Sequence, residues 1–391
     1  MDFDTLRVYY QRFFPYQDVF LWLNHDRTPQ ADFLDREIAF TIENAYVRYQ
    51  SYMNADAFKA DVLRLMPTRF EYGPVYSANP RQRKMLPKGA CVPVKKEFCL
   101  DIDLSDYNSV RTCCTDTAVC NKCWKFATIA IEILNVALRE DFGFQNLLWV
   151  FSGRRGVHCW VSDAAALTLD EAQRSSIAAY LQVLGTSTQG KLVNLPRPFH
   201  PHIARSFGIL KSHFKQVVLE EQDPWRSADQ AEELLKRLQP ADLVARLRSK
   251  WGSKEIPSSQ RWADIDTETR QLPVSSGSRN SVGDAVLAAK QDIIFEYLYP
   301  RLDAAVSRGL NHLLKSPFVV HPSTGKICVA LDLKKLDEFD IDAVPRYDAI
   351  VKELDATNDI TKTSLRDYTE YFRHHVQETL PKKRAADTLD F

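Results

Sequence analysis

Apolar residues alternate with polar or small residues between positions 98 and 104. This two-residue period predicts a strand with one buried face. Asp101 and Asp103 then share the other face, about 6.5–7 Å apart along the strand. Two carboxylates at this short distance repel each other unless a cation lies between them. The matching cation is a hard divalent ion such as Mg²⁺ or Mn²⁺. The alternative is that both acids are solvated on an edge strand.

Helical spacing of apolar residues predicts several helices. They are expected over 6–14, ending at Pro15, over 124–141, ending at Gly143, over 234–247 with a break at Pro240, over 285–299 and over 364–380. Strands are expected over 147–151 and 157–161, and strand-like segments over 301–306, 318–320 and 327–331. The last two segments can form a hairpin around 322–325.

The chain has 391 residues, more than one compact domain usually holds. Its helical middle, 206–299, is expected to be an insertion into a core formed by 1–205 and 300–380. Within the middle, the Ser/Gly-rich stretch 273–283 predicts an exposed loop. The basic tail, 381–391, is expected to be disordered.

Composition narrows the class of protein only slightly. Hydrophobic residues make up 45% of the chain, which argues against global disorder. Basic and acidic residues both number 51, so net charge indicates no partner. Locally, the stretch 81–96 holds six basic residues and no acid, which suits either a phosphate-contacting surface or a solvated loop. We expect a soluble intracellular protein without a signal peptide or membrane span.

A cysteine cluster is the second chemical signal. Cys113, Cys114, Cys120 and Cys123 lie within eleven residues, and four thiolates can bind one Zn²⁺ tetrahedrally. The adjacent pair requires a tight turn, and the alternative is a set of buried or free cysteines. Because four ligands leave no open position, the predicted zinc site, within 113–123, is structural. The remaining cysteines, Cys91, Cys99, Cys159 and Cys328, are scattered and suit core packing.

The loop between the two expected strands is the third signal. Its sequence from Ser152 to His158 contains two glycines, which permit a tight turn. Arg154 and Arg155 provide fork-shaped donors that suit phosphate oxygens. Alone, the loop is better explained as a basic hairpin turn with ordinary surface arginines, because Arg-rich turns are common. Next to an acidic strand, it predicts a clamp for a triphosphate.

A fourth group follows position 300. Asp303, on an expected strand, can complete a carboxylate trio with the earlier pair. Lys315 and His321 follow shortly after it, and each is ordinary when considered singly.

These motifs together resemble the small, catalytic subunits of archaeal–eukaryotic DNA primases, in the eukaryotic branch, over most of the chain. The resemblance rests on residues 46–50, 98–103, 149–160, 300–303, 309–318 and 321–322 and on the cysteine cluster. It implies a mixed α/β core around a mixed sheet, with a structural zinc motif and an inserted all-helical subdomain. It also implies that Asp101, Asp103 and Asp303 hold two catalytic Mg²⁺ or Mn²⁺ ions. The implied nucleotide-binding residues are Arg48, Ser152, Arg154, Arg155, His158, Lys315 and His321, with Glu71 near the ribose.

The implied activity is synthesis of RNA primers from ribonucleoside triphosphates on a single-stranded DNA template, by two-metal nucleotidyl transfer. The resemblance further implies a heterodimer with a large primase subunit, association with the DNA polymerase α complex, and a nuclear location. Two alternatives stay open. One is a repair-type primase-polymerase that uses deoxynucleotides, and the other is a nonenzymatic zinc-containing scaffold that binds nucleic acid.

Overall fold

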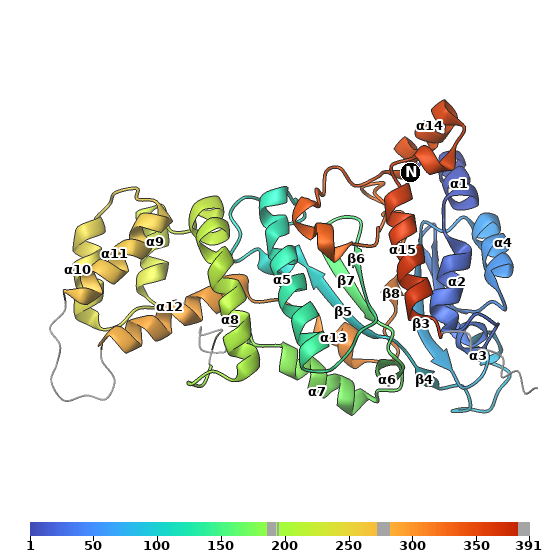
Figure 1. Ribbon diagram of the computed structural model, residues 1–391, viewed down its shortest axis with the longest axis horizontal. Helices are drawn as coiled ribbons and strands as arrows, with labels where there is room; N and C mark the ends of the chain where they lie inside the picture. The colour runs from blue at the N-terminus through green and yellow to red at the C-terminus, as the bar shows by residue number, and fades with distance from the viewer. Residues whose placement is uncertain (186–192, 194, 272–281, 382–391) are drawn as a thin grey trace, which may run out of the picture. The chain divides into compact units, whose positions relative to one another are not determined.

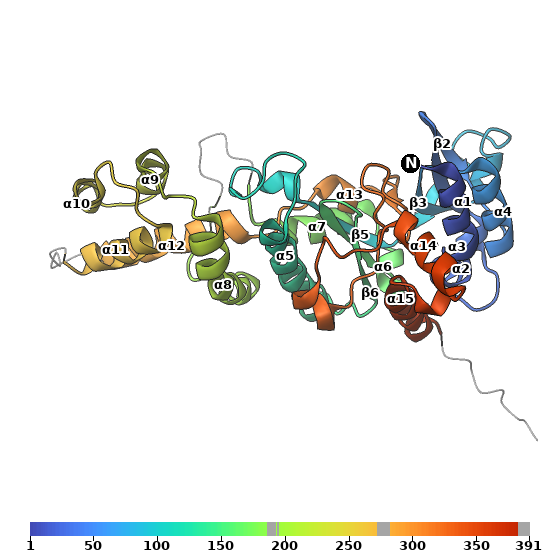
Figure 2. The same cartoon turned by 90° about the horizontal axis from the view of Figure 1, so that it is seen from above.

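The computed structural model describes residues 1–185, 193, 195–271 and 282–381 (Figures 1 and 2). The chain divides into two compact units. The first comprises Met1–Asp101, Phe144–Ala178 and Asp303–Phe391, and the second Ile102–Gly143 and Ala179–Leu302. The loop expected at 273–283 and the tail expected at 381–391 lie, except for residues 282, 283 and 381, outside the described residues. The domain limits at 205/206 and 299/300 stay a prediction.

The first unit contains a five-stranded sheet that the sequence patterns did not predict. Its order is β2 (Ala45–Gln50), β1 (Arg36–Ile42), β3 (Arg69–Tyr76), β4 (Pro93–Lys95), with β8 (Leu314–Lys315) also paired to β3. All these pairs are antiparallel. Helices α1 (Phe3–Arg12), α2 (Tyr16–Asn24) and α4 (Ala55–Leu65) pack together beside it (Figure 1). The rings of Phe40, Phe58 and Phe70 join sheet and helices in one buried aromatic core.

A second sheet carries the predicted acidic strand. Its order is β5 (Phe98–Asp103), β7 (Gly156–Val161), β6 (Leu147–Phe151). The sequence prediction of these three strands is confirmed. β6 and β7 form an antiparallel hairpin in which Val150 lies opposite His158. β5 crosses the division between the two units after Asp101.

The segment after position 300 differs from its prediction. Residues 301–306 were expected to form a strand, but they form an irregular stretch followed by helix α13 (Ala304–Arg308). The reason is local, because Asp303 is a helix cap: its Oδ1 accepts a hydrogen bond from the Ala305 N–H at 3.0 Å. Residues 318–320 and 327–331 pair through the isolated bridge Val320–Ile327, so the hairpin is present but too short to form full strands.

Shorter helices and the chain's end complete the first unit. They are α3 (Ala31–Leu34), η1 (Pro80–Gln82), α6 (Ala164–Leu167), η4 (Leu333–Glu338), α14 (Tyr347–Thr357), η5 (Ile360–Lys362) and α15 (Arg366–Thr379). The last of these confirms the helix predicted over 364–380.

Among the described residues, regular structure wholly within the second unit is helical. Its elements are η2 (Leu104–Tyr107), α5 (Asn121–Glu140), α8 (Pro201–Phe214), the π-helix η3 (Lys215–Gln222), α9 (Ala228–Leu235), α10 (Ala241–Trp251), α11 (Ser258–Arg270) and α12 (Val282–Leu298). Helix α7 (Glu171–Leu181) crosses the division between the units. Figure 1 draws α9, α10 and α11 as one cluster, with α12 leading away from it. No helix in the described residues is long and apolar enough to cross a membrane.

Candidate active site and metal site

Two of the three predicted acids, Asp101 and Asp303, lie next to each other. Asp101 is the last residue of β5 that belongs to the first unit. The Asp303 backbone N–H donates to the Asp101 carbonyl at 3.0 Å. Ser307 of α13 donates its hydroxyl to the Cys99 carbonyl at 2.8 Å, which fixes this helix against the strand. Asp303 thus reaches Asp101 as the cap of a short helix and not, as expected, as a member of a strand.

Asp103 ends β5 and belongs to the second unit. Its Oδ1 accepts hydrogen bonds from the Ser105 N–H at 2.8 Å and hydroxyl at 2.7 Å, which caps η2. Strand alternation directs its side chain to the same face as that of Asp101, about 6.5–7 Å further along. Both side chains are half-buried. Partly accessible carboxylates are the hard oxygen donors that Mg²⁺ and Mn²⁺ require, so the donor chemistry fits either ion.

His158 lies next to this acidic end of the sheet. Its Nε2 is 3.6 Å from Oδ1 of Asp101, and its ring is buried. Burial, together with the charges of Lys315 and Arg69, lowers the pKa of His158 to about 3. The ring is therefore neutral at pH 7, and the contact with Asp101 is not an ion pair. Its buried Nδ1 has no hydrogen-bond partner among the described residues, and an unsatisfied buried polar atom is uncommon in a folded protein.

The predicted clamp is a tight loop between β6 and β7. The Ser152 N–H donates to the Gly156 carbonyl at 2.9 Å, and the Gly156 N–H donates to the Ser152 hydroxyl at 3.0 Å. Between them, Gly153 has φ +88°, a conformation that favours glycine. A Cβ at this position would lie 2.6 Å from Cβ of His321. The loop therefore packs directly against the segment that carries His321.

Side chains from the late segment hold the clamp loop from outside. Lys315 donates its ammonium to the Ser152 carbonyl at 2.9 Å, and Thr324 donates its hydroxyl to the Gly153 carbonyl at 2.7 Å. The predicted Lys315 and His321 thus join the loop, although more than 150 residues separate them from it in sequence.

The electrostatics of this region are those of an anion site. Burial lowers the pKa of His321 to about 3, and four cations add to the shift; they are, in decreasing order, Lys315, Arg154, Arg69 and Arg155. Among the described residues, no carboxylate lies within ion-pair distance of Arg154. Positive charges that converge on one loop favour binding of a polyanion.

Arg48 and Glu71 lie on the neighbouring sheet. Arg48 forms a fork with the buried carboxylate of Glu37, at 2.8 and 3.0 Å. Its Nη2 also donates to the Asn311 carbonyl at 3.3 Å. Glu71 accepts from the Tyr46 hydroxyl at 2.5 Å and lies opposite Lys315 in the β3–β8 register. The structure therefore brings Glu71 beside Lys315, whereas the charge of Arg48 is already matched by Glu37.

Sequence reasoning did not find two of these charged residues. Arg69 forms an ion pair with Glu71 and contributes to the lowered pKa of both histidines. Its i, i+2 relation to Glu71 on a strand places both side chains on one face, and this was the available signal. Glu37 is fully buried and gave no signal, because a single acid in an apolar strand has no distinctive pattern.

The predicted zinc ligands converge in the second unit. Four Sγ atoms lie within 4.8 Å of one another, those of Cys113, Cys114, Cys120 and Cys123. The Sγ atoms of Cys120 and Cys123 are 4.0 Å apart, close to the edge of about 3.8 Å that a tetrahedron with Zn–S bonds of about 2.3 Å requires. Hydrogen bonds from Cys113, the Cys120 N–H and Arg111 lower the pKa of Cys123 to about 5, against the opposing effect of burial. The cluster therefore fits a structural Zn²⁺.

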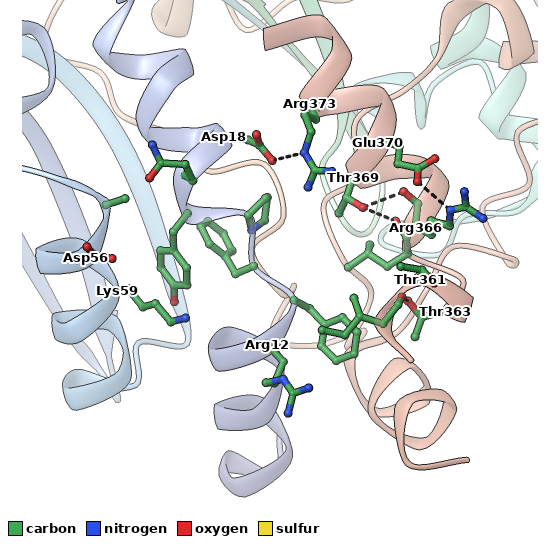
Figure 3. A pocket seen from close by; sticks show the side chains of 18 residues that line it. Arg12, Asp18, Asp56, Lys59, Thr361, Thr363, Arg366, Thr369, Glu370 and Arg373 are labelled. Carbon is green, nitrogen blue, oxygen red and sulfur yellow. Dashed lines mark hydrogen bonds and ion pairs between the residues drawn. The ribbon is translucent and has the colours of Figure 1, made fainter. Parts of the chain in front are cut away.

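A cavity of about 410 Å³ elsewhere in the first unit contains none of the predicted site residues (Figure 3). It lies among the α1–α2 turn, α4 and the start of α15. Its charged groups are partly paired, Asp18 with Arg373 at 3.2 Å and Arg366 with Glu370 at 2.8 Å. Its lining includes neither the three predicted acids nor the clamp loop, so it is not the candidate active site.

Comparison with known proteins shows to which family this chain belongs. Residues 100–333 match the family model described as DNA primase small subunit. The DNA primase small subunit of Schizosaccharomyces pombe is 46% identical, over 100% of this chain and 94% of the relative. The chain belongs to the DNA primase small subunit family. The Saccharomyces cerevisiae member is 38% identical over 96% of this chain and 91% of its own length, and the Drosophila melanogaster member 35% over 92% and 83%.

More distant members of the primase family are archaeal. The PriS subunit of Halorubrum lacusprofundi is 25% identical over 58% of this chain and 57% of its own length. The range that matches the primase family model includes Asp101, the clamp loop, Asp303 and the late segment with Lys315 and His321. Arg48 and Glu71 precede it.

Proposed function

We propose that this chain is the catalytic subunit of a DNA primase, a nucleotidyltransferase that synthesises RNA primers on single-stranded DNA. The observation that carries the proposal is the positively charged clamp beside Asp101 and Asp303. A triphosphate is complementary to the positive charge of the clamp, and its α-phosphate must come near carboxylates that hold divalent ions.

In this proposal the clamp binds the incoming ribonucleoside triphosphate. Arg154 and Arg155 pair with phosphate oxygens in fork geometry, and Lys315 adds a third positive charge. His158 and His321 are neutral, so each donates through one ring nitrogen without requiring a counter-charge. These preorganised donors offset the charge that develops on the leaving pyrophosphate. Glu71, held by Tyr46 and Arg69, is placed for the ribose.

Asp101, Asp103 and Asp303 are the proposed ligands of two divalent ions, Mg²⁺ or Mn²⁺. When bound, these ions supply charge neutralisation at the triphosphate and a lower pKa for the attacking 3′-hydroxyl. The carboxylates themselves orient the reacting groups, because hydrogen bonds to Ala305 and Ser105 fix two of them. The Cys113–Cys123 cluster takes no part in chemistry, since four thiolates saturate Zn²⁺.

The partners are proposed from family membership. As a small subunit, the chain works in a primase complex. We propose a large primase subunit as its heterodimeric partner, association with the DNA polymerase α complex, and a nuclear location.

The direct test is RNA synthesis without a primer on single-stranded DNA by the purified chain, with and without a large subunit. Asp103→Asn should abolish synthesis and leave template binding unchanged, because it removes a metal ligand and no template contact. Asp355→Asn, at an exposed acid on α14, is the matched control and should be fully active. Near-normal priming by Asp103→Asn would refute the metal assignment.

Two further measurements separate the alternatives. A repair-type primase-polymerase would prefer deoxynucleotides in direct competition with ribonucleotides. A scaffold would bind the template and synthesise nothing with either. For the clamp, Arg155→Lys should weaken nucleotide binding and leave affinity for single-stranded DNA nearly unchanged, while the exposed Arg12→Lys should change neither. If Arg155→Lys instead lost template binding alone, the loop would belong to a nucleic-acid surface.

A further inference from the structure

The helical part of the second unit contains a groove of about 760 Å³ that none of the proposed active-site or zinc residues lines. Helices α8 with η3, α11 and α12 form its walls, and they pack against one another. The residues that α11 contributes are Ser259, Trp262, Ala263, Asp266, Thr269 and Arg270. Their spacing of i, i+3, i+4, i+7, i+10 and i+11 is one continuous helix face, about three turns or 16.5 Å long.

The other two walls have the same character. α12 lines the groove from Gly283 to Ile294 at helical spacing, and α8 with η3 lines it from Phe207 to Leu219. Three helices thus present one lengthwise stripe each to a common groove. In a helical bundle such a surface is completed by a further helix, because side chains of a fourth helix interlock with three facing stripes.

The lining provides an apolar floor. Phe214, Val286 and Ile294 are buried in it, and the ring of the half-buried Trp262 packs against Phe214 with centroids 4.8 Å apart and planes tilted by 51°. Leu287 lies on the same α12 stripe with 55% of its surface exposed. Leu287 thus extends the apolar floor to the surface, and a contiguous exposed apolar patch is typical of a docking surface.

Positive charge surrounds this floor. Lys211, Lys215 and Arg270 line the groove and are exposed, and Lys215 has only a loose surface pair with Glu220 at 3.7 Å. The acid of the lining, Asp266, is already paired with Lys290 at 2.6 Å. Among the described residues that line the groove, cationic side chains outnumber acidic ones, so the rim is complementary to an acidic partner.

The state of Trp262 argues against single-stranded nucleic acid as the occupant. Such binding relies on bases that stack on free aromatic rings. The Trp262 ring is already stacked on Trp225, with centroids 5.7 Å apart and planes 10° apart, and Lys290 Nζ lies 4.4 Å from its centroid. The groove offers apolar sockets between helices and not a stacking platform.

We propose that this groove is a docking site for an acidic amphipathic helix of about three turns from a partner protein. The apolar face of that helix lies on Trp262 and Leu287, and its flanking Glu or Asp side chains meet Lys211, Lys215 and Arg270. In helix-in-groove recognition of this kind, the bound helix inserts anchor side chains from positions i, i+3, i+4 and i+7.

The test uses fluorescence polarisation with the full chain and a labelled 14-residue peptide that has Leu at i, i+3, i+4 and i+7 and Glu on both flanks. The comparison peptides are a scramble of the same composition, which has no apolar stripe, and the same stripe flanked by Lys. The acidic helix should bind, and both comparison peptides should bind at least about tenfold more weakly, the ratio that about 1.4 kcal/mol produces. Rising salt should weaken binding of the acidic helix.

Two variants locate the site. Leu287→Glu and the pair Lys211→Glu/Lys215→Glu change exposed side chains, so both proteins should fold normally and each should lose about tenfold or more in affinity. Leu34→Glu, at a leucine 40% exposed in the first unit, is the control and should bind like the wild type. The proposal would be overturned if all three peptides bound equally or if the wild type bound none of them. It would also be overturned if a single-stranded oligonucleotide competed with the peptide and Leu287→Glu abolished that competition.

Discussion

Substitution of Gly153 by alanine tests whether the clamp loop is held as tightly as the structure indicates. Two costs add at this position. The first is the φ of +88°, because a left-handed backbone costs a residue with a Cβ about 1–2 kcal/mol. The second is the 2.6 Å approach to Cβ of His321, about 1 Å inside the normal carbon–carbon separation of about 3.5–4.0 Å. No side-chain rotation relieves this contact, because a Cβ moves only with its backbone.

We therefore expect Gly153→Ala to lower the free energy of unfolding by about 2–5 kcal/mol, since overpacking adds about 1–3 kcal/mol to the backbone cost. In a unit of this size the melting temperature should fall by about 4–20 °C. Gly89 is the matched control in the same unit: its φ is +85°, and a Cβ there would meet nothing within 4 Å. Gly89→Ala should therefore show the backbone cost alone, about 2–8 °C.

The same shift should be visible in catalysis. If the loop yields by about 1 Å, Arg154 and Arg155 move with it, and a misplacement of this size can cost about 10²-fold in rate. Scanning fluorimetry and the rate of the first dinucleotide bond should both single out Gly153→Ala over Gly89→Ala. The double variant Gly153→Ala/His321→Gly removes the closest contact and should recover more than about 1 kcal/mol of stability. Equal melting temperatures for the two alanine variants would show that the loop and the His321 segment are not in close contact.

Three other predictions follow from buried or clustered charges. Glu97 and Arg36 form a fully buried ion pair with contacts of 2.9 and 3.0 Å, so Glu97→Gln leaves Arg36 without a counter-charge and should lower the free energy of unfolding by about 3–5 kcal/mol. The double variant Arg36→Met/Glu97→Leu should lose less stability, as measured by thermal or chemical unfolding. Unchanged stability of Glu97→Gln would contradict the reasoning. Cys120→Ser should reduce bound zinc from about one per chain and impair solubility, whereas Cys91→Ser, outside the cluster, should retain the metal on elemental analysis; full zinc in Cys120→Ser would exclude a four-thiolate site. Because the pKa of His321 is lowered in the folded protein, the fold gains stability above pH 6.5, and this stability is lost as the pH falls toward 3. A bound triphosphate raises that pKa, so nucleotide affinity should increase from pH 8 to pH 6 more steeply in the wild type than in His321→Asn. Parallel pH profiles of affinity, measured by calorimetry, would disprove the linkage.

The buried ion network around Glu97 illustrates how the active strand is positioned. Glu97 immediately precedes β5 and accepts from Arg36, which begins β1, and it also contacts His25 at 3.0 Å. Burial raises the cost of its charge, but Arg36 and His25 hold the pKa of Glu97 well below its usual range. The pair therefore ties the start of the strand that carries Asp101 to the other sheet. Nothing in the local pattern around Glu97 indicates this role.

The sequence by itself determined the features that repeat along short stretches of chain. Alternation identified β5, strand-like segments identified β6 and β7, helical spacing identified α5, α12 and α15, and the spacing of Cys113 to Cys123 indicated a metal site. Each of these follows from geometry within about twenty residues, because strand and helix periods are fixed by the backbone. The clamp loop was likewise readable, since its glycines and arginines are consecutive.

Only the tertiary structure decided which distant segments meet. The five-stranded sheet, the helix cap formed by Asp303, the contact of His321 with Gly153 and the ring of cations that includes Arg69 all depend on pairings across many residues. Local pattern does not specify them, because a short strand or a single charged residue gains its environment from packing partners elsewhere in the chain. Asp303 shows this most clearly: its neighbours suggested a strand, yet its side chain caps a helix while its backbone bonds to Asp101.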